Sequence, residues 1–348
     1  MTDLLPHIQD RRILIAPLCW GLGHAARCIP LISHLTQHNH VEIASDGLAL
    51  RWLTDELPDL SSHELPSYDI QYTDKPSFFR YLDHLTSSYK AIHAEHDATK
   101  RIVKDHSIDL IISDHRLGVR SDKVQSVLLA HQLTIPFASG LVRKSASEVH
   151  TKLISKFDDC WVPDYPEESK QLSGRLSHAA LSIPKSYIGP LSRFAGMRLE
   201  EPTADLDMVV ILSGVEPDRT RLEKKLYDIL SHQPDYSVAL VRGTPTARPS
   251  YMTESKSHME IYDLATTAEL STLLRDAQLV VSRSGYSTIM DLHVLGKKAI
   301  YIPSEYQPEQ LYLGELAHKG QRTSCLQEHA LSSISLFTEV KRLIEPSK

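Results

Sequence analysis

Short apolar runs recur along the chain and alternate with longer stretches whose apolar residues are spaced three or four positions apart. Short continuous runs are typical of strands buried in a parallel sheet, and the wider spacing is typical of amphipathic helices. The expected strands are 13–18, 41–44, 110–113, 136–140, 208–212, 237–241, 279–282 and 299–303. The expected helices are 27–37, 121–131, 221–230, 269–275, 287–295 and 331–344. This alternation predicts an α/β protein with parallel sheets rather than a β-sandwich.

The pattern restarts near residue 205, after a stretch that is rich in proline and glycine. Such loop-forming composition favours a linker, and a length of 348 residues favours two domains. We therefore expect an N-terminal doubly wound domain over 1–190, a linker over 191–206 and a C-terminal doubly wound domain over 207–348. The last helix is expected to pack back onto one of the domains, the N-terminal domain being one option.

Composition and charge narrow the class of protein. The 38 Lys and Arg residues against 44 Asp and Glu residues give a net charge of −6, so we expect no nucleic-acid partner. The four cysteines are widely spread, which predicts neither a disulfide framework nor a cysteine zinc site. No apolar run approaches the roughly 18–20 residues that cross a bilayer. We expect a cytoplasmic protein, and peripheral contact with the inner face of a membrane stays open.

The first predicted strand leads into Gly21-Leu22-Gly23-His24 and then a helix. Glycines at such a turn let the backbone approach a ligand closely, and the helix N-terminus favours negative charge. Ala26 replaces the third glycine of the dinucleotide fingerprint, but Asp46 follows about 20 residues later, so a nicotinamide site stays open. Alternatively, His24 is a general base at a strand end, or an incidental residue of a tight turn.

Asp114 follows the predicted strand 110–113 directly. Ligands of open α/β sheets bind beyond the carboxyl ends of the strands, so Asp114 and His24 are expected to face one crevice. There the carboxylate would orient His24 and stabilise its charged form. The alternative is that Asp114 caps the following segment. His115 and Arg116 are expected to be loop residues.

The strand 208–212 leads into a second small turn, in which Ser213 and the Gly214 amide could bind a phosphate. Arg219 or Thr220 would then neutralise it. An ordinary strand-to-helix connection is the competing interpretation.

The strand 279–282 precedes Arg283-Ser284-Gly285, with Ser287 in the first turn of the next helix and Asp291 one turn later. Amides and hydroxyls at this turn suit a pyrophosphate, and the carboxylate of Asp291 suits a ribose diol. Glu309 and Gln310 follow the next strand and suit the hydroxyls of a sugar.

With these residues identified, the chain resembles the GT-B glycosyltransferases, and among them the MurG-like family 28 enzymes that use UDP-N-acetylglucosamine. The likeness is carried by Arg283-Ser284-Gly285 with Asp291 and Gln310, and by Gly21-Leu22-Gly23-His24. Asp291 stands where the MurG enzymes have Glu, and Gly214 replaces a richer glycine loop. The rest of the N-terminal half is divergent, so the resemblance does not name the acceptor.

The resemblance implies two Rossmann-like domains facing across a cleft, with the donor in the C-terminal one. It implies that Ser284 and Gly285 contact the diphosphate, Asp291 the ribose, and Glu309 and Gln310 the donor sugar. The chain near Arg242 would hold the base, which is uridine in the family. GT-B enzymes generally stabilise the leaving group without a metal, so neither a metal nor a cofactor is expected.

We therefore expect an inverting hexosyl or N-acetylhexosaminyl transferase of cell envelope glycan synthesis. It would move a sugar from a nucleotide-diphosphate donor, a UDP-sugar, to a hydroxyl of a carbohydrate or lipid-linked acceptor. His24 would act as the base, with Asp114 behind it. Two alternatives stay open: a nucleotide-sugar hydrolase on the same fold, and a non-catalytic nucleotide-sugar-binding subunit that partners a membrane protein.

Overall fold

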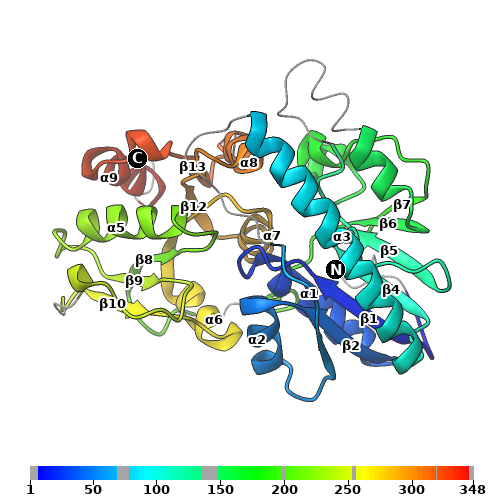
Figure 1. The fold of residues 1–348 in the computed structure, drawn as a ribbon. Helices are drawn as coiled ribbons and strands as arrows, with labels where there is room; N and C mark the ends of the chain where they lie inside the picture. Colours follow the sequence, from blue (N-terminus) through cyan, green and yellow to red (C-terminus); the bar gives the residue numbers. More distant parts are fainter. Residues whose placement is uncertain are drawn as a thin grey trace. The chain divides into compact units, whose positions relative to one another are not determined.

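The computed structural model describes residues 7–68, 78–134, 148–197, 201–252, 256–318 and 320–344, with 78–89 described by their backbone alone. The chain divides into two compact units, Met1–Arg193 and Phe194–Lys348 (Figure 1). Each unit is built on one sheet, and every strand pairing described in either sheet is parallel. The prediction of two doubly wound parallel-sheet domains is confirmed.

The first unit holds a seven-stranded sheet in the order β3-β2-β1-β4-β5-β6-β7. The order reverses between β1 and β4, and such a switch point is where open α/β sheets bind ligands, beyond the carboxyl ends of the strands. Its strands are β1 (Arg12–Pro17), β2 (His40–Ser45), β3 (Ser62–Glu64), β4 (Leu110–Asp114), β5 (Gln125–Leu129), β6 (Asp159–Val162) and β7 (Lys185–Tyr187). Its helices are α1 (Gly23–Leu35), α2 (Gly47–Glu56), α3 (Phe78–His106), η2 (Glu168–Lys170) and η3 (Gly174–Ser177).

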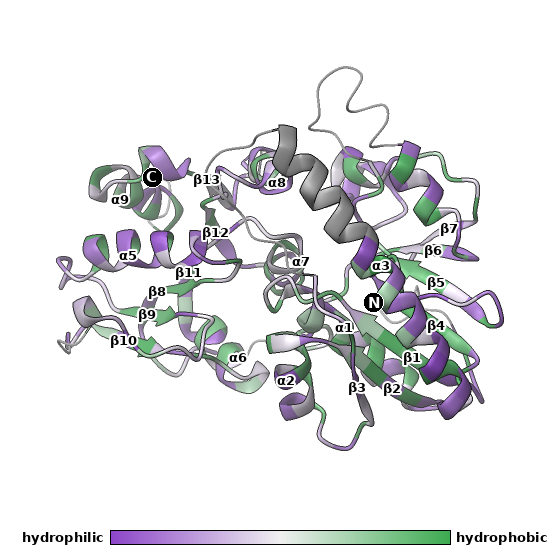
Figure 2. Cartoon of the chain, in the orientation of Figure 1, coloured by the Kyte–Doolittle hydropathy of each residue, from purple (hydrophilic) through white to green (hydrophobic). Residues whose placement is uncertain are grey.

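Alternating residues of the central strands contribute side chains to two hydrophobic cores, one on each face of this sheet. Ile13 and Ile15 of β1 pack with residues of α1 and α2, whereas Leu14 and Ala16 pack with residues of α3. Both faces are therefore apolar, which explains why these strands read as continuous hydrophobic runs. Figure 2 shows the hydrophobic colour concentrated on the strands, while the outer helices carry both colours.

The second unit holds a six-stranded sheet in the order β10-β9-β8-β11-β12-β13, which reverses between β8 and β11. Its strands are β8 (Leu206–Ile211), β9 (Val238–Val241), β10 (Met259–Tyr262), β11 (Ala277–Ser282), β12 (Lys298–Tyr301) and β13 (Thr323–Cys325). Its helices are α5 (Asp218–Leu230), η4 (Ser250–Met252), α6 (Thr267–Asp276), α7 (Tyr286–Leu295), α8 (Pro308–Ala317), η5 (Glu328–Ala330) and α9 (Ser333–Ile344).

The helices α5 and α9 share one core with the second sheet. Leu226 of α5 and Leu336 and Val340 of α9 are buried together with Met208 and Val281 of the strands. The last helix thus packs on the sheet of its own unit, which corrects the option that it covers the N-terminal domain.

Most predicted elements are present, and one is wrong. Seven expected strands lie within two residues of β1, β2, β4, β8, β9, β11 and β12, whereas 136–140 lies outside the described residues. The helix expected over 121–131 is instead the strand β5. Val127 and Leu129 pack on one face of the sheet and Leu128 on the other, so an unbroken apolar run produced a helix-like spacing by accident.

The longest helix described in the first unit, α3, has a polar composition. Across the described ranges, no helix combines the length and the apolar character that crossing a membrane requires.

Candidate functional site

Two loops leave the first sheet side by side at its switch point. The register pairs Pro17, the last residue of β1, with Asp114, the last residue of β4. The amide of Leu18 donates to the carbonyl of Asp114 at 3.1 Å, which joins the two loops at their base. The glycine turn with Gly21 (φ +68°) and Gly23 then leads into α1, so His24 lies in the first turn of that helix.

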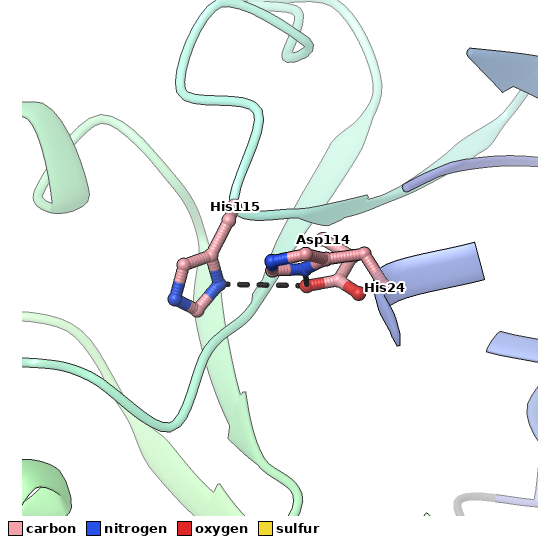
Figure 3. A group of neighbouring side chains, drawn as sticks. All are labelled: His24, Asp114 and His115. Carbon is pink, nitrogen blue, oxygen red and sulfur yellow. Dashed lines mark hydrogen bonds and ion pairs between the residues drawn. The ribbon is translucent and has the colours of Figure 1, made fainter. Parts of the chain in front are cut away.

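His24 and Asp114 are in contact, as the two strand ends predicted. Nδ1 of His24 lies 3.1 Å from Oδ1 of Asp114, and Figure 3 draws this contact as a dashed line. An ionised carboxylate only accepts hydrogen bonds, so Nδ1 of His24 carries the proton of this contact, and Nε2 is the nitrogen that can exchange a proton with a substrate. The carboxylate is fully buried while the imidazole is 15% exposed, so His24 is the reachable member of the pair.

Arg27, one turn further along α1, holds the same carboxylate. Its Nε donates to Oδ2 of Asp114 at 2.7 Å, and its Nη2 donates to Oδ1. Burial raises the pKa of Asp114, but the charges of Arg27 and His24 and their hydrogen bonds outweigh it and hold that pKa far below its usual range. Nothing in the sequence distinguishes Arg27 as a site residue, because an arginine in a helix ordinarily faces solvent.

His115 approaches the carboxylate from the other side. Its Nδ1 lies 3.4 Å from Oδ1 of Asp114, and its ring centre lies 5.2 Å from that of His24 (Figure 3). The backbone of His115 has φ +60°, an uncommon conformation for a residue with a side chain. Burial, and then the charge of His24, hold the pKa of His115 well below its usual value, so this second imidazole is neutral. The expectation that His115 is an ordinary loop residue is therefore too simple.

His24, Asp114 and His115 each offer a ligand atom within 4.8 Å of the others, as a metal site requires. Arg27 argues against a cation there, because its buried guanidinium already neutralises both oxygens of Asp114. The cluster is better described as a histidine whose tautomer and charge are set by a buried ion pair.

An apolar pocket adjoins this cluster within the first unit. It measures about 250 Å³, and His115 is one of its walls. In the part of the chain that the structure describes, Nε2 of His115 has no hydrogen-bond partner. Its apolar walls are Leu18, Trp20, Ile92, Leu117, Leu128 and Ala130.

Asp46, the acidic residue of the dinucleotide interpretation, is buried against Arg116. Nη1 of Arg116 donates to Oδ1 of Asp46 at 2.6 Å, and its Nε donates to Glu95 at 2.6 Å. The same guanidinium donates to the carbonyls of Pro17 and Pro66. Asp46 is thus taken up in a buried ion pair, and the structure gives no support to its use on a ribose. Arg116, expected as a loop residue, is fully buried.

In the second unit, β8 leads into Ser213 and Gly214, which has φ +118°. The backbone conformation there explains the glycine, because a side chain at this φ is strained. Arg219, expected to neutralise a phosphate, is buried and held by Glu216 and Glu223. Its guanidinium therefore stabilises the first turns of α5 through these two carboxylates.

Arg242 and Arg283 were expected among the residues of the donor site, but the structure binds both side chains within their own unit. Arg242 is buried, with Nε 3.0 Å from Glu223 and Nη1 2.7 Å from Asp263. Arg283 is also buried, and it binds Glu328, Asp218 and the carbonyl of Ile302. Both guanidinium groups bind carboxylates of their own unit. These two residues therefore stabilise the loops that follow β9 and β11.

The turn after β11 places a helix start at the switch point of the second sheet. Gly285 caps α7, Ser287 lies in its first turn and Asp291 lies about one turn later, partly exposed. Gly285 has an ordinary φ of −69°, and a Cβ built on it meets no atom within 4 Å. The fold of this unit therefore does not require a glycine there. Open space above a helix N-terminus is suited to a close-fitting anion.

The start of α8 lies against this turn. The hydroxyl of Ser284 donates to the carbonyl of Gln310 at 2.7 Å, and both residues are buried. The Gln310 side chain accepts from the amide of Ser304 at 3.0 Å and donates to Gln307 at 2.8 Å. Glu309 is partly exposed in the first turn of α8. The structure thus brings Ser284, Gly285, Glu309 and Gln310 to one edge of the sheet, with Glu309 the more accessible of the last two.

Comparisons with known structures identify the fold as GT-B. The glycotransferase of kitacinnamycin aligns over 97% of this chain and 92% of its own, with a TM-score of 0.66 and 12% identity. The glycosyltransferase VinC in complex with dTDP aligns over 96% and 91%, with a TM-score of 0.63 and 14% identity. MurG of Acinetobacter baumannii aligns over 96% and 92%, with a TM-score of 0.55 and 12% identity. At these identities the likeness shows the fold, which MurG shares with the other two glycosyltransferases.

A family model matches the sequence of most of the second unit. Residues 215–348 match the family model described as glycosyltransferase family 28 C-terminal domain. The matched range contains Arg283, Gly285, Asp291, Glu309 and Gln310, and it begins one residue after Gly214. No curated protein matches the chain.

Proposed function

We propose that this protein is an inverting glycosyltransferase that moves a sugar from a nucleoside-diphosphate donor to a hydroxyl of an acceptor. The observation that carries the proposal is the His24–Asp114 pair at the switch point of the first sheet. A reachable imidazole whose Nδ1 proton is fixed by a buried carboxylate is suited to act as a general base. The family 28 match of residues 215–348 supports a sugar nucleotide as the other substrate.

In the proposed reaction, Nε2 of His24 accepts the proton of the acceptor hydroxyl. The hydroxyl oxygen forms a bond to the anomeric carbon, and the bond from that carbon to the diphosphate oxygen breaks. The nucleoside diphosphate leaves with the electron pair, and attack from the opposite side inverts the configuration. Asp114 stays ionised and stabilises the imidazolium that forms, while Arg27 keeps it ionised.

The second unit would bind the donor through the start of α7. The backbone amides and the dipole of a helix N-terminus stabilise negative charge, and this stabilisation grows as the diphosphate leaves. Gly285 would let the diphosphate approach the backbone, and Asp291 would accept hydrogen bonds from the ribose. Glu309 and Gln310 would bind the sugar. Because Arg242 and Arg283 are occupied internally, we assign them the support of these loops.

We propose a pyrimidine nucleoside diphosphate as the leaving group, with a UDP-hexose or UDP-N-acetylhexosamine as the first candidate donor. The resemblance to MurG-like enzymes supports uridine, and the dTDP in the structure of VinC supports a pyrimidine more generally. We further propose that transfer needs no metal or cofactor, because a helix N-terminus supplies the stabilisation of the leaving group.

The apolar pocket beside His115 supports an acceptor that has an apolar portion. Its aliphatic and aromatic walls would bind a hydrocarbon or an aromatic ring system, and a hydroxyl of the acceptor would lie beside His115, which lines the pocket. This chemistry is shared by lipid-linked acceptors and by hydrophobic small molecules.

The test is calorimetry and thermal unfolding with UDP, dTDP, GDP, UDP-glucose and UDP-N-acetylglucosamine, on the wild type and on Asp291→Ala. A ligand that binds the folded state raises its stability, so selective stabilisation by one pyrimidine nucleotide, lost in Asp291→Ala, is expected. Binding of none of these nucleotides would overturn the proposal. With the donor found, sugar release without acceptor would favour the hydrolase, and binding without turnover would favour a non-catalytic subunit.

A further inference from the structure

A second group of potential ligand atoms lies in the first unit, toward the amino ends of its strands. Glu42 is the third residue of β2, and its side chain is only 1% exposed. It pairs in register with Leu14, whereas the loops that carry His24 and Asp114 lie beyond the opposite, carboxyl ends of β1 and β4. This carboxylate therefore takes no part in the proposed chemistry.

Two imidazoles converge on one oxygen of this carboxylate. Nε2 of His63 lies 2.7 Å from Oε2 of Glu42, and Nδ1 of His106 lies 3.0 Å from the same oxygen. The two rings pack edge to face, with centroids 4.3 Å apart. The three ligand atoms lie within 4.8 Å of one another and come from β2, β3 and the last residue of α3.

The surroundings hold this carboxylate in place through its other oxygen. Oε1 of Glu42 accepts from Nη2 of Arg12 at 3.0 Å and contacts Nε2 of His40 at 3.1 Å. Arg12 also donates to the backbone carbonyl of His106 at 2.7 Å, which fixes the end of α3. Hydrogen bonds from outer groups to a ligating carboxylate are typical of metal sites, and here they leave Oε2 to the two imidazoles.

We propose that Glu42, His63 and His106 bind a structural Zn²⁺ ion. Two imidazole nitrogens and one carboxylate oxygen bind zinc with water in the fourth position, an open coordination that is common in catalytic sites. We assign a structural role because the group lies toward the amino ends of the strands, opposite the loops that carry His24 and Asp114. Zinc bonds of about 2.0–2.1 Å in a tetrahedron place the ligand atoms about 3.3 Å apart, so each imidazole nitrogen must move away from Oε2 by only about half an ångström. His106 can make this movement and gives the ion a path from solvent, because its side chain is 41% exposed.

The Glu42 group is a better cation site than the group around Asp114. Arg27 contacts both oxygens of Asp114 from within the core, so a metal there would meet a buried positive charge at the ligating atoms. At Glu42, within the described residues, the guanidinium of Arg12 contacts only Oε1, the oxygen that His63 and His106 do not use, and it is partly exposed to solvent. The ion would tie together β2, β3 and the end of α3, and its loss would weaken the unit without removing a reacting group.

The experiment measures Zn²⁺ binding to the chelator-treated full-length protein by calorimetry, and Co²⁺ binding by its visible absorption. The test variants are His63→Gln and His106→Asn, whose amides keep a hydrogen-bond donor near the replaced ring nitrogen but are poor zinc ligands. The matched control is His40→Gln, which removes an imidazole from the same carboxylate but from its other oxygen. A second control is His24→Asn, in the other cluster. Circular dichroism checks that each variant is folded.

We expect one Zn²⁺ per chain in the wild type, raising the unfolding temperature, and a tetrahedral Co²⁺ spectrum. Each test variant should lose at least about 100-fold in affinity, more than changes in outer groups typically cost, whereas His40→Gln and His24→Asn should retain binding. The proposal is overturned if the wild type binds no zinc, if the test variants bind it as the wild type does, or if binding is lost in His24→Asn instead. Since the ion is structural, a folded His63→Gln variant should keep its catalytic rate, which separates this result from that of the proposed function.

Discussion

Arg27 holds both carboxylate oxygens of Asp114, and the pair is buried one helical turn from His24. The guanidinium cancels the charge of a carboxylate that the core would otherwise reject, and the carboxylate in turn fixes the histidine. The reactivity of an exposed side chain thus depends on an ion pair that solvent does not reach, and the first two predictions concern that dependence.

Replacing Arg27 with Met should destabilise the first unit. The substitution leaves Asp114 buried without its main counter-charge, and breaking such a pair typically costs about 3–5 kcal/mol. The free energy of unfolding in urea is the measurement. The control is Arg11→Met, because Arg11 is 52% exposed and lies 3.6 Å from Asp109, so this substitution should cost less than about 1 kcal/mol. Equal losses in the two variants would show that the buried pair adds nothing.

Acidification should weaken the wild type through Asp114. Its pKa is lower in the folded protein than the ordinary value of 3.8, so below about pH 5 the unfolded chain binds a proton that the folded chain does not. The stability contributed by Asp114 is therefore complete at neutral pH and is lost progressively as the pH falls through and below that ordinary value. Urea midpoints measured from pH 7 to pH 3 should show a shallower decline in an Arg27→Met/Asp114→Asn double variant than in the wild type. Parallel curves would contradict the assignment.

Replacing His24 with Ala should slow sugar transfer without weakening the binding of the nucleotide donor. General-base catalysis is typically worth about 10²–10⁴-fold, so kcat with a saturating acceptor should fall by that factor. The nucleotide affinity, measured by calorimetry, should stay within about twofold, because His24 belongs to the first unit. An unchanged kcat would remove His24 from the reaction.

Two glycines of the second unit should respond oppositely to alanine. A Cβ on Gly285 meets no atom within 4 Å, so Gly285→Ala should fold, with a loss below about 2 kcal/mol at the helix cap. Its nucleotide affinity should nevertheless fall about tenfold or more, since the new methyl occupies the space proposed for the diphosphate. Nucleotide affinity equal to that of the wild type would place the diphosphate elsewhere.

Gly243→Ala is the matched control. Gly243 has φ +70°, and its Cβ would lie 2.2 Å from the carbonyl oxygen of Leu212, so this variant should lose more than about 1 kcal/mol of stability. The comparison of unfolding midpoints with nucleotide affinities separates a glycine that the fold needs from a glycine that a ligand needs.

The central strands could be predicted from the sequence because burial on both faces produces apolar runs of the right length. The same property caused the error at β5, where Leu128 and Val127 serve opposite faces and the run resembles a helix. The edge strands β3 and β7 are three residues long and carry polar side chains, so no hydrophobic pattern marks them. They form because the sheet offers unpaired backbone groups at its edges.

The candidate site was predictable where it depends on strand order. His24 and Asp114 each follow a parallel strand, and the carboxyl ends of parallel strands meet at one edge. The roles of Arg27, Arg242 and Arg283 were not predictable, because nothing local distinguishes an arginine that binds a ligand from one that pairs with a buried carboxylate. That distinction depends on partners far away in the sequence, as with Arg283 and Glu328.

Arg116 joins segments that are distant in the sequence at the carboxyl edge of the first sheet. Its guanidinium binds the side chains of Asp46 and Glu95 and the carbonyls of Pro17 and Pro66, so the end of β1, the segments after β2 and β3 and the middle of α3 share one charged group. If one of these segments opened locally, the buried guanidinium of Arg116 would lose a partner, which is costly for a buried charge. Amide hydrogen exchange across them should therefore follow one common opening event, and the edge that carries His24 should behave as a single cooperative foldon rather than as independent loops.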